Sequence, residues 1–377
     1  MSNDKTITPP EEVKKPRSND APVDKEHGEG NNGLNLVDLS DAHTGKGPQK
    51  ASDSVLTAAG RDAIREGTLS KEALDQIVSR ARETHSDSLV VMKDGKLVAQ
   101  WYSNNEQKVM LTHSMTKSVT NLAVGQLVGE GKLSLDQKVG DFFPEWKTGD
   151  KKDVTVRELM NHTSGMPFHA KEPTLHAALD ANLLTKPGTN FEYSTAAVDV
   201  LAGIVEKVSG KPMDKYAADN ILKPLGITNY KWEEDAEGHA EGGTGLWANA
   251  TDLAKIGQMM LNGGRWEGKQ IVSSDWIAQS TKPSQNLNKE CGLLWWLEDP
   301  RFNADQSGHS TYVGAEGFSA HGAFGQYLVI SPKEHLVAVR QIDKANYKSD
   351  DDFFTDFSPL ARKLVPDKAA PILQIHY

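Results

Sequence analysis

Two segments of the chain carry the hydrophobic pattern of paired β-strands. The first, SLVVMKDGKLVAQWY at residues 88–102, has apolar runs on both sides of Lys93-Asp94-Gly95-Lys96, and an Asp-Gly pair in this setting favours a β-hairpin. The second, GQYLVISPKEHLVAVRQI at residues 325–342, has apolar runs on both sides of Ser331-Pro332-Lys333-Glu334. The run CGLLWWL at residues 291–297 also predicts β-structure.

Helical spacing dominates the middle of the chain. From Ser114 onward apolar residues recur at intervals of three and four, which predicts an amphipathic helix of about four turns that stops near Gly129 and Gly131. The same spacing predicts further helices within residues 69–85, 154–163, 195–210, 251–264 and 352–365.

The order of these elements indicates an α+β fold. Because β-rich ends flank a helical middle, we expect an antiparallel sheet built from both ends of the chain, flanked by helices and carrying a helical insertion. The predicted domain covers residues 51–377, with an α/β part at 51–113 and 265–377 and a mainly helical part at 114–264. Residues 1–50 are polar and poor in aromatic residues, which predicts a disordered or extended tail.

Composition excludes several classes of function. The net charge of −10 argues against nucleic-acid binding. No run of about 18 apolar residues predicts a membrane span. The single cysteine, Cys291, rules out an internal disulfide and is expected to be a small buried apolar residue. Neither HExxH nor a phosphate-binding glycine loop occurs, so we expect no metal and no cofactor.

The N-terminus bears on the cellular compartment. Its first residues, MSNDKTITPPEEVKKPRSND, lack the apolar core of a signal peptide. We therefore expect a cytoplasmic protein if Met1 is the native start, and a periplasmic or secreted one if a signal peptide has been removed.

The stretch THSMTKSVT at residues 112–120 carries the strongest chemical signal. Ser114 and Lys117 are three apart, so on a helix they share a face, with Ser114 near the free N–H groups of the helix start. A serine hydroxyl needs a base to become a nucleophile, and a buried lysine can supply one. The alternative is a capping serine followed by a surface lysine, since Ser-x-x-Lys also occurs at Ser2–Lys5.

Longer stretches around this pair resemble the serine β-lactamase and penicillin-binding-protein superfamily, in particular its class C-like esterase branch, which includes 6-aminohexanoate-dimer (nylon-oligomer) hydrolases. The similar segments are HSMTKSVTNLAVGQLVGEGKLSLDQKVGDFFPEW, VTVRELMNHTSGMP, FEYSTAAVDVLAGIVEKVSGKPMDKYAADNILKPLGI and GLWANATDLAKIGQMMLNGG. The resemblance runs from about Leu89 to Arg340. The absence of Gly-x-Ser-x-Gly also argues against the α/β-hydrolase fold.

The resemblance implies roles for three residues. Ser114 would be the acylated nucleophile and Lys117 its partner in activation, while Tyr193 matches the tyrosine of the family's Tyr-x-Asn motif and would move the proton. Taken without the resemblance, Tyr193 is better explained as a half-buried aromatic side chain with a satisfied hydroxyl.

Two positions depart from the family pattern. Thr195 replaces the asparagine of Tyr-x-Asn, and His321-Gly322-Ala323 stands where the family usually has Lys-Thr-Gly. The amides of Ser114 and Ala323 are the predicted oxyanion donors. His321 is either a substrate contact or an ordinary strand histidine.

Further side chains are candidates for substrate binding. We place Thr195 on the substrate side. Trp247 and the pair Trp295-Trp296 would line an apolar acyl pocket or pack in the core.

The resemblance implies a serine hydrolase that cleaves a small-molecule carboxylic ester or linear amide through an acyl-enzyme. A β-lactamase or DD-peptidase is the alternative within the same chemistry, and the missing asparagine and lysine weigh against it. A catalytically inactive binding protein of the same fold is the alternative from another class. A homodimer is left open.

Overall fold

The computed structural model describes residues 55–304, 310–348 and 354–366, so the predicted tail at residues 1–50 lies outside the described residues. The first predicted hairpin is confirmed: β1 (Ser88–Lys93) pairs antiparallel with β2 (Lys96–Tyr102). Asp94 and Gly95 connect the two strands with φ angles of 49° and 76°. This left-handed pair is what an Asp-Gly hairpin turn requires.

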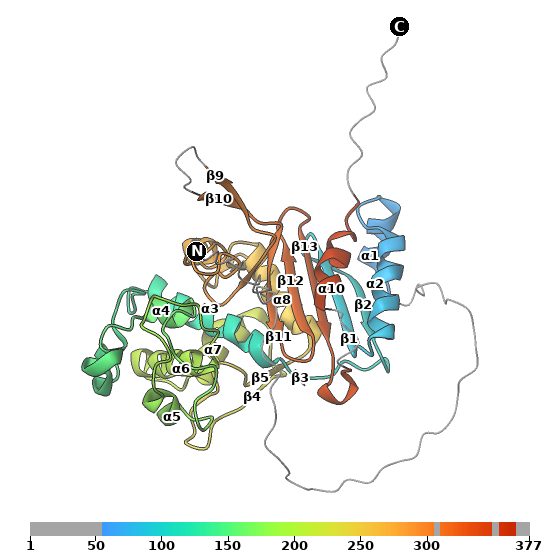
Figure 1. Cartoon of the computed structure of the whole chain (residues 1–377). Coiled ribbons are helices and arrows are strands. Elements are labelled where there is room, and N and C mark those ends of the chain that lie inside the picture. The colour runs from blue at the N-terminus through green and yellow to red at the C-terminus, as the bar shows by residue number, and fades with distance from the viewer. Residues whose placement is uncertain (1–54, 305–309, 349–353, 367–377) are drawn as a thin grey trace, which may run out of the picture. The chain divides into compact units, whose positions relative to one another are not determined.

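A six-stranded antiparallel sheet in the order β2-β1-β13-β12-β11-β8 joins the two ends of the chain (Figure 1). Its later strands are β8 (Trp296–Glu298), β11 (Gly317–Gly322), β12 (Gln326–Ser331) and β13 (Leu336–Gln341). In the middle of the sheet β1 pairs with β13, with Val90 opposite Val339. The predicted α+β fold with a sheet from both chain ends is therefore confirmed.

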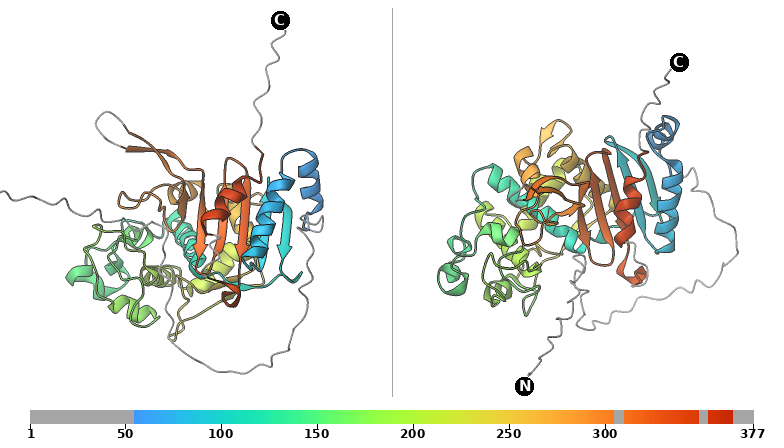
Figure 2. Two further views of the ribbon diagram at one scale, coloured as in Figure 1. Left: turned by 45° about the vertical axis from the view of Figure 1, so that its right-hand side comes forward. Right: turned by 45° about the horizontal axis from the view of Figure 1, so that its top comes forward.

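Helices cover both faces of this sheet. On one face α1 (Ala58–Arg65), α2 (Lys71–Glu83) and α10 (Phe354–Arg362) pack together, as both views in Figure 2 show. Leu89 and Val91 of β1 point into this layer, whereas Val90 and Met92 point into the core on the other side. Because both faces are covered, the inner strands β1, β12 and β13 are buried along almost their whole length instead of alternating.

The helix α8 (Ala250–Leu261) lies against the second face. A Cβ atom on its Gly257 would come within 2.6 Å of Val337 and 2.8 Å of Leu328, so the helix approaches the sheet closely. The predicted helical part at residues 114–264 includes this helix, although the helix packs on the sheet. The division of the domain into two parts stays a prediction.

The remaining helices are α3 (Thr116–Gly129), α4 (Val156–Met160), α5 (Leu175–Asp180), α6 (Thr195–Ser209), α7 (Met213–Ala217) and α9 (Ser274–Ser280). Short 3-10 turns occur at Val139–Asp141, Pro144–Lys147, Gly149–Lys151, Lys223–Leu225 and Lys344–Asn346, and a π turn at Ala218–Leu222. Within the described residues no helix is both long and apolar enough to cross a bilayer.

The prediction of an amphipathic helix after Ser114 is wrong in one respect. Nearly all of α3 is buried, including Thr120 and Asn121, which are 0% exposed. Their side chains donate to buried acceptors: Thr120 to the carbonyl of Gly242 at 2.7 Å, and Asn121 to that of Leu293 at 2.8 Å. Burial of these polar groups is tolerated because each is hydrogen-bonded.

Short strands complete the fold. They are β3 (Met110–Leu111), β4 (Lys231–Trp232), β5 (Leu246–Ala248), β6 (Arg265–Trp266), β7 (Lys269–Gln270), β9 (Arg301–Ala304) and β10 (Ser310–Gly314). The predicted strand at residues 291–297 is realised only from Trp296, because Leu294 adopts a left-handed backbone with φ 58° that breaks the extended run.

Candidate active site

Ser114 lies in a 3-10 turn, His113–Met115, that leads directly into α3. Two hydrogen bonds to β5 fix this turn: the Thr112 hydroxyl donates to the carbonyl of Leu246 at 2.9 Å, and the Leu246 amide donates to the Thr116 hydroxyl at 3.1 Å. The α-helix therefore starts two residues later than the sequence predicts. Ser114 stands just ahead of it.

The amine of Lys117 is buried and surrounded by oxygen atoms. Its side chain lies in the first turn of α3, and the residue is 2% exposed. The Nζ atom donates to Ser114 Oγ at 3.0 Å, to Thr195 Oγ1 at 3.0 Å and to the carbonyl of Gly243 at 2.9 Å. Ser114 and Lys117 thus share one face, as the spacing predicts, and the lysine is not on the surface.

Tyr193 closes the group of reactive side chains. It precedes α6, and its phenol hydrogen-bonds to Ser114. Its ring centroid lies 5.0 Å from Lys117 Nζ and 5.9 Å from the stacked ring of Trp296. Burial raises the pKa of Tyr193 above its usual range, and the hydrogen bond with Ser114 opposes that shift only in part. The tyrosine hydroxyl is therefore protonated unless a proton is shared with Lys117.

The ring of His162 packs against the ring of Tyr193. Its ring centroid is 4.6 Å from that of Tyr193, and its Nδ1 atom accepts the Ser194 amide at 3.2 Å. This hydrogen bond fixes the tautomer with the proton on Nε2. Burial and then the nearby Lys117 lower the pKa of His162 to about 3, so its ring is neutral. Its backbone has φ 58°, a left-handed conformation that places this residue in a turn.

The opposite wall is formed by β11, where His321 is held by polar neighbours. Its Nε2 atom lies 2.8 Å from Ser319 Oγ and 3.6 Å from Glu298 Oε1 on β8. Ser319 also donates to the Glu298 carboxylate. Burial alone would raise the pKa of Glu298, but the hydrogen bond and charge of His321, with the bond from Ser319, bring it down to about 2. A histidine backed by a carboxylate thus occupies the wall where the family usually has lysine.

The pocket between these walls brings most of the predicted residues together. Its lining residues are Ser114, Lys117, Ser118, His162, Tyr193, Cys291, Leu294, Trp295, Trp296 and His321. Thr195 does not line this pocket; its hydroxyl accepts a hydrogen bond from Lys117 Nζ. Trp247 does not line this pocket, and its indole N–H donates to Glu233 at 2.9 Å. Burial raises the pKa of Cys291 to about 12, which keeps it a neutral thiol.

Ala323 begins the turn between β11 and β12, and this turn packs against the turn of Ser114. A Cβ atom on Gly322 would lie 2.2 Å from the carbonyl oxygen of Thr112, and the rings of Phe324 and His113 are 5.0 Å apart. Only a glycine permits this approach at position 322. The role of the Ala323 amide as an oxyanion donor stays a prediction.

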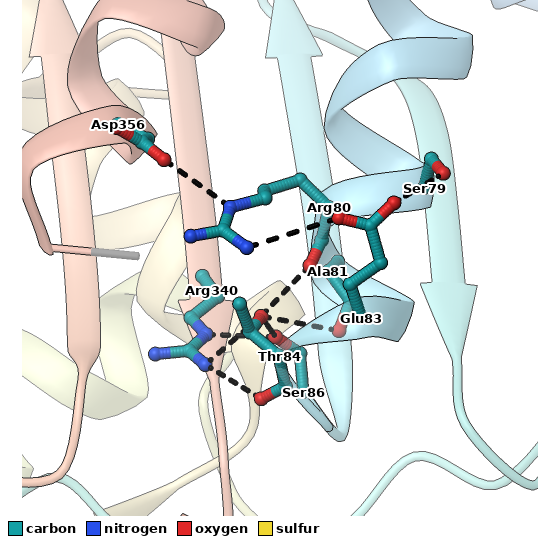
Figure 3. A network of polar contacts seen from close by, with 8 residues as sticks. All are labelled: Ser79, Arg80, Ala81, Glu83, Thr84, Ser86, Arg340 and Asp356. Atoms are coloured by element: carbon teal, nitrogen blue, oxygen red, sulfur yellow. Dashed lines mark hydrogen bonds and ion pairs between the residues drawn. The ribbon is translucent and has the colours of Figure 1, made fainter. Parts of the chain in front are cut away.

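A buried arginine anchors the same turn to the rest of the sheet. Arg340 is 1% exposed, and it donates to the carbonyl of Gly325 at 2.7 Å. Figure 3 shows its guanidinium beside Thr84 and Ser86 after the end of α2, where it donates to Ser86 Oγ at 2.8 Å and to the carbonyl of Thr84 at 3.2 Å. The turn at residues 323–325 is thereby tied to the segment that follows α2.

Residues 55–304, 310–348 and 354–366 contain no group of three or more His, Cys, Asp or Glu side chains placed to hold a metal ion. The reactive groups that line the pocket are the hydroxyl of Ser114, the amine of Lys117, the phenol of Tyr193 and the imidazole of His321.

A sheet from both chain ends, with a Ser-x-x-Lys turn facing a tyrosine across the pocket, defines the class of β-lactamase- and transpeptidase-like hydrolases. The chain belongs to the β-lactamase family, whose model, described as Beta-lactamase, matches residues 74–353. The protein is accordingly a hydrolase of this family.

Known proteins agree with this assignment. The chain is 24% identical over 342 residues to a candidate D-alanyl-D-alanine carboxypeptidase of Escherichia coli strain K12, covering 69% of this chain and 78% of that one. It resembles in structure a candidate 6-aminohexanoate-dimer hydrolase from Bacillus anthracis, with a TM-score of 0.62, 21% identity and coverage of 77% and 83%. A family VIII carboxylesterase gives a TM-score of 0.58, 18% identity and coverage of 78% and 97%. At these identities the structural likeness establishes the fold.

Proposed function

We propose that the protein is a serine hydrolase that cleaves a carboxylic ester or a linear amide through an acyl-enzyme on Ser114. The observation that carries this proposal is the 3.0 Å contact between Lys117 Nζ and Ser114 Oγ in a buried pocket, with Tyr193 hydrogen-bonded to the same serine. A capping serine beside a surface lysine would have neither the burial nor the tyrosine.

The chemistry follows from these contacts. Ser114 Oγ attacks the substrate carbonyl, and its proton passes to the Tyr193–Lys117 pair. The resulting oxyanion is held by the amides of Ser114 and Ala323. The bond to the leaving alcohol or amine then breaks, and the pair returns a proton to that group. Water adds to the acyl carbon with the same pair as base, which frees Ser114 and releases the acid.

The two walls of the pocket favour a linear substrate over a β-lactam. Thr195 is engaged by Lys117, and His321 by Ser319 and Glu298. Neither reproduces the asparagine and lysine with which β-lactam-processing relatives contact the amide and the carboxylate of their substrates. Trp295, Trp296 and Leu294 make the rest of the lining largely apolar, which suits the acyl chain of an ester or amide.

The proposal is tested by intact-protein mass spectrometry after exposure to a fluorophosphonate probe. We expect one adduct on the wild type and none on Ser114→Ala. Ser118→Ala is the matched control, because Ser118 lines the same pocket but donates to the carbonyl of Leu294 at 2.7 Å. An adduct that survives Ser114→Ala, or a folded wild type that stays unlabelled, would overturn the proposal in favour of a binding protein.

A substrate panel then separates the substrate classes. Short-chain p-nitrophenyl esters, 6-aminohexanoate dimer and a chromogenic cephalosporin are compared by kcat/KM. Faster turnover of the cephalosporin than of every ester and linear amide would contradict the proposed substrate class while leaving the nucleophile in place.

A further inference from the structure

The third acceptor of the Lys117 amine is a backbone carbonyl, and this carbonyl is itself held in position. The Gly243 carbonyl accepts from Lys117 Nζ at 2.9 Å, and the Gly243 amide donates to Asp199 Oδ1 at 3.0 Å. A single residue of the loop before β5 therefore connects a carboxylate on α6 to the lysine on α3.

This loop fits so tightly that the connection is fixed. A Cβ atom on Gly242 would lie 2.7 Å from the Cβ of Ala202, and one on Gly243 would lie 2.6 Å from Thr195 Cγ2. Two adjacent glycines are needed for the backbone to approach α6 this closely. Thr120 of α3 additionally donates to the Gly242 carbonyl at 2.7 Å, which anchors the loop on the other helix.

Asp199 stands one helical turn after Thr195 and shares its face of α6. Thr195 contacts Lys117 directly, whereas Asp199 contacts it through Gly243. Burial raises the pKa of Asp199. The positive charge of Lys117 lowers this pKa, whereas the negative charges of Glu241 and Asp235 in the neighbouring loop raise it. Asp199 does not line the substrate pocket, so it acts on the lysine and not on the substrate.

We propose that Asp199 is a positioning residue for Lys117, which fixes the Gly243 peptide against the lysine amine and sets the charge balance of the Ser114–Lys117–Tyr193 group. This inference rests on the proposed function, since it assigns a part in activating Ser114. A carboxylate near the Tyr193–Lys117 pair favours the state of the pair that carries the extra proton. That state cannot accept the proton of Ser114, so the ionised form of Asp199, which is present above about pH 7, raises the pH at which the nucleophile becomes active.

The test is the rate of fluorophosphonate labelling from pH 5 to pH 9 for the wild type, Asp199→Asn and Glu206→Gln. Asparagine keeps an oxygen that can accept the Gly243 amide and removes only the charge. We expect the acidic limb of the Asp199→Asn profile to move to lower pH by about one unit, the shift that one charge roughly 10 Å away produces at an effective dielectric near 20. Glu206→Gln is the matched control on α6, because Glu206 pairs with His239 at 3.1 Å.

A purely structural role would change the labelling rate equally at every pH. A profile of Asp199→Asn that superimposes on that of the wild type therefore overturns the inference. Asp199→Ala provides a second removal of the charge, and it should show the same shift together with a roughly tenfold slower plateau because the Gly243 amide loses its acceptor. Ser114→Ala, run alongside, separates the two levels of the argument. Loss of labelling in Ser114→Ala with an unshifted Asp199→Asn profile defeats only this inference, whereas labelling of Ser114→Ala defeats the proposed function itself.

Discussion

The amine of Lys117 and the hydroxyl of Thr195 lie 3.0 Å apart, at the position where the family's Tyr-x-Asn motif has its asparagine. A threonine hydroxyl oxygen can accept a hydrogen bond from an ammonium group just as an amide oxygen can. Threonine in place of asparagine therefore keeps an acceptor for the lysine. It lacks the side-chain amide N–H₂ that an asparagine could donate to a substrate.

The first prediction concerns this contact. Thr195→Val keeps the shape of the side chain and removes the acceptor, so we expect kcat/KM on the best substrate of the panel to fall about tenfold, the rate equivalent of one lost hydrogen bond. Thr195→Ser keeps the hydroxyl and is the matched control. Equal rates for Thr195→Val and the wild type would show that the lysine does not need this acceptor.

The second prediction concerns the proton carrier. Tyr193→Phe retains the stacking with Trp296 but cannot relay a proton, so we expect kcat to fall by about 10²–10⁴. Steady-state kinetics measure the effect. Tyr216→Phe is the control, because Tyr216 is also buried and its hydroxyl has no hydrogen-bond partner among the described residues. A loss of less than tenfold in Tyr193→Phe would remove this residue from the mechanism.

The third prediction is a pH dependence of stability at Glu298. The pKa of this carboxyl is lowered to about 2 in the folded protein, from an ordinary value of 4.5. A lowered pKa contributes stability above pH 4.5, and this contribution is lost as the pH falls toward 2. We expect Glu298→Gln to be less stable than the wild type at pH 7, by on the order of 2 kcal/mol, with the difference vanishing near pH 2. Urea unfolding at several pH values measures it, and a difference independent of pH would contradict the assignment.

The fourth prediction has the opposite sign and concerns Asp199. Burial raises the pKa of this carboxyl to about 7 from 3.8, against the pull of Lys117 and the Gly243 amide. The ionised form is then disfavoured by folding, so the carboxyl lowers stability increasingly between pH 4 and pH 7. Asp199→Asn should be the more stable protein at pH 8, with a margin that disappears below pH 4. Thermal unfolding at pH 4 and pH 8 compares the two, and a mutant less stable at pH 8 would reverse the sign.

The fifth prediction concerns Arg340, which anchors the turn between β11 and β12. Arg340→Met leaves the carbonyls of Gly325 and Thr84 without this buried donor, so we expect a loss of about 3 kcal/mol in the free energy of unfolding. Arg82→Met on the exposed side of α2 is the control and should cost less than about 0.5 kcal/mol. Denaturant titration measures both, and equal stabilities of the two variants would show that Arg340 does not anchor the turn.

Local sequence predicted those elements whose geometry is decided within a few residues. The hairpins β1–β2 and β12–β13 follow from apolar runs around short polar turns, and the Ser114–Lys117 face follows from a spacing of three. The predicted start of α3 is two residues too early. Hydrogen bonds with Leu246 of β5, far away in the sequence, stabilise a 3-10 turn at His113–Met115 instead.

The supporting residues of the site escaped prediction for a different reason. Glu298 and Asp199 act through Ser319 and Gly243, and no local pattern indicates which loop will face which helix. The adjacent glycines at 242 and 243 were the one usable signal. They mark a backbone that must approach another element closely, and the sequence alone does not identify that element as α6.

The pairing of β1 with β13 has a consequence for how the protein is made. Leu89 and Arg340 are register partners, so the centre of the sheet joins segments that leave the ribosome about 250 residues apart. Contacts so distant in sequence slow folding, because a long loop must close before they form. The edge of β1 that pairs with β13 must therefore stay unpaired until nearly the whole chain has been synthesised. A nascent chain that stops before β13 would expose this hairpin to aggregation and would depend on chaperones for that interval.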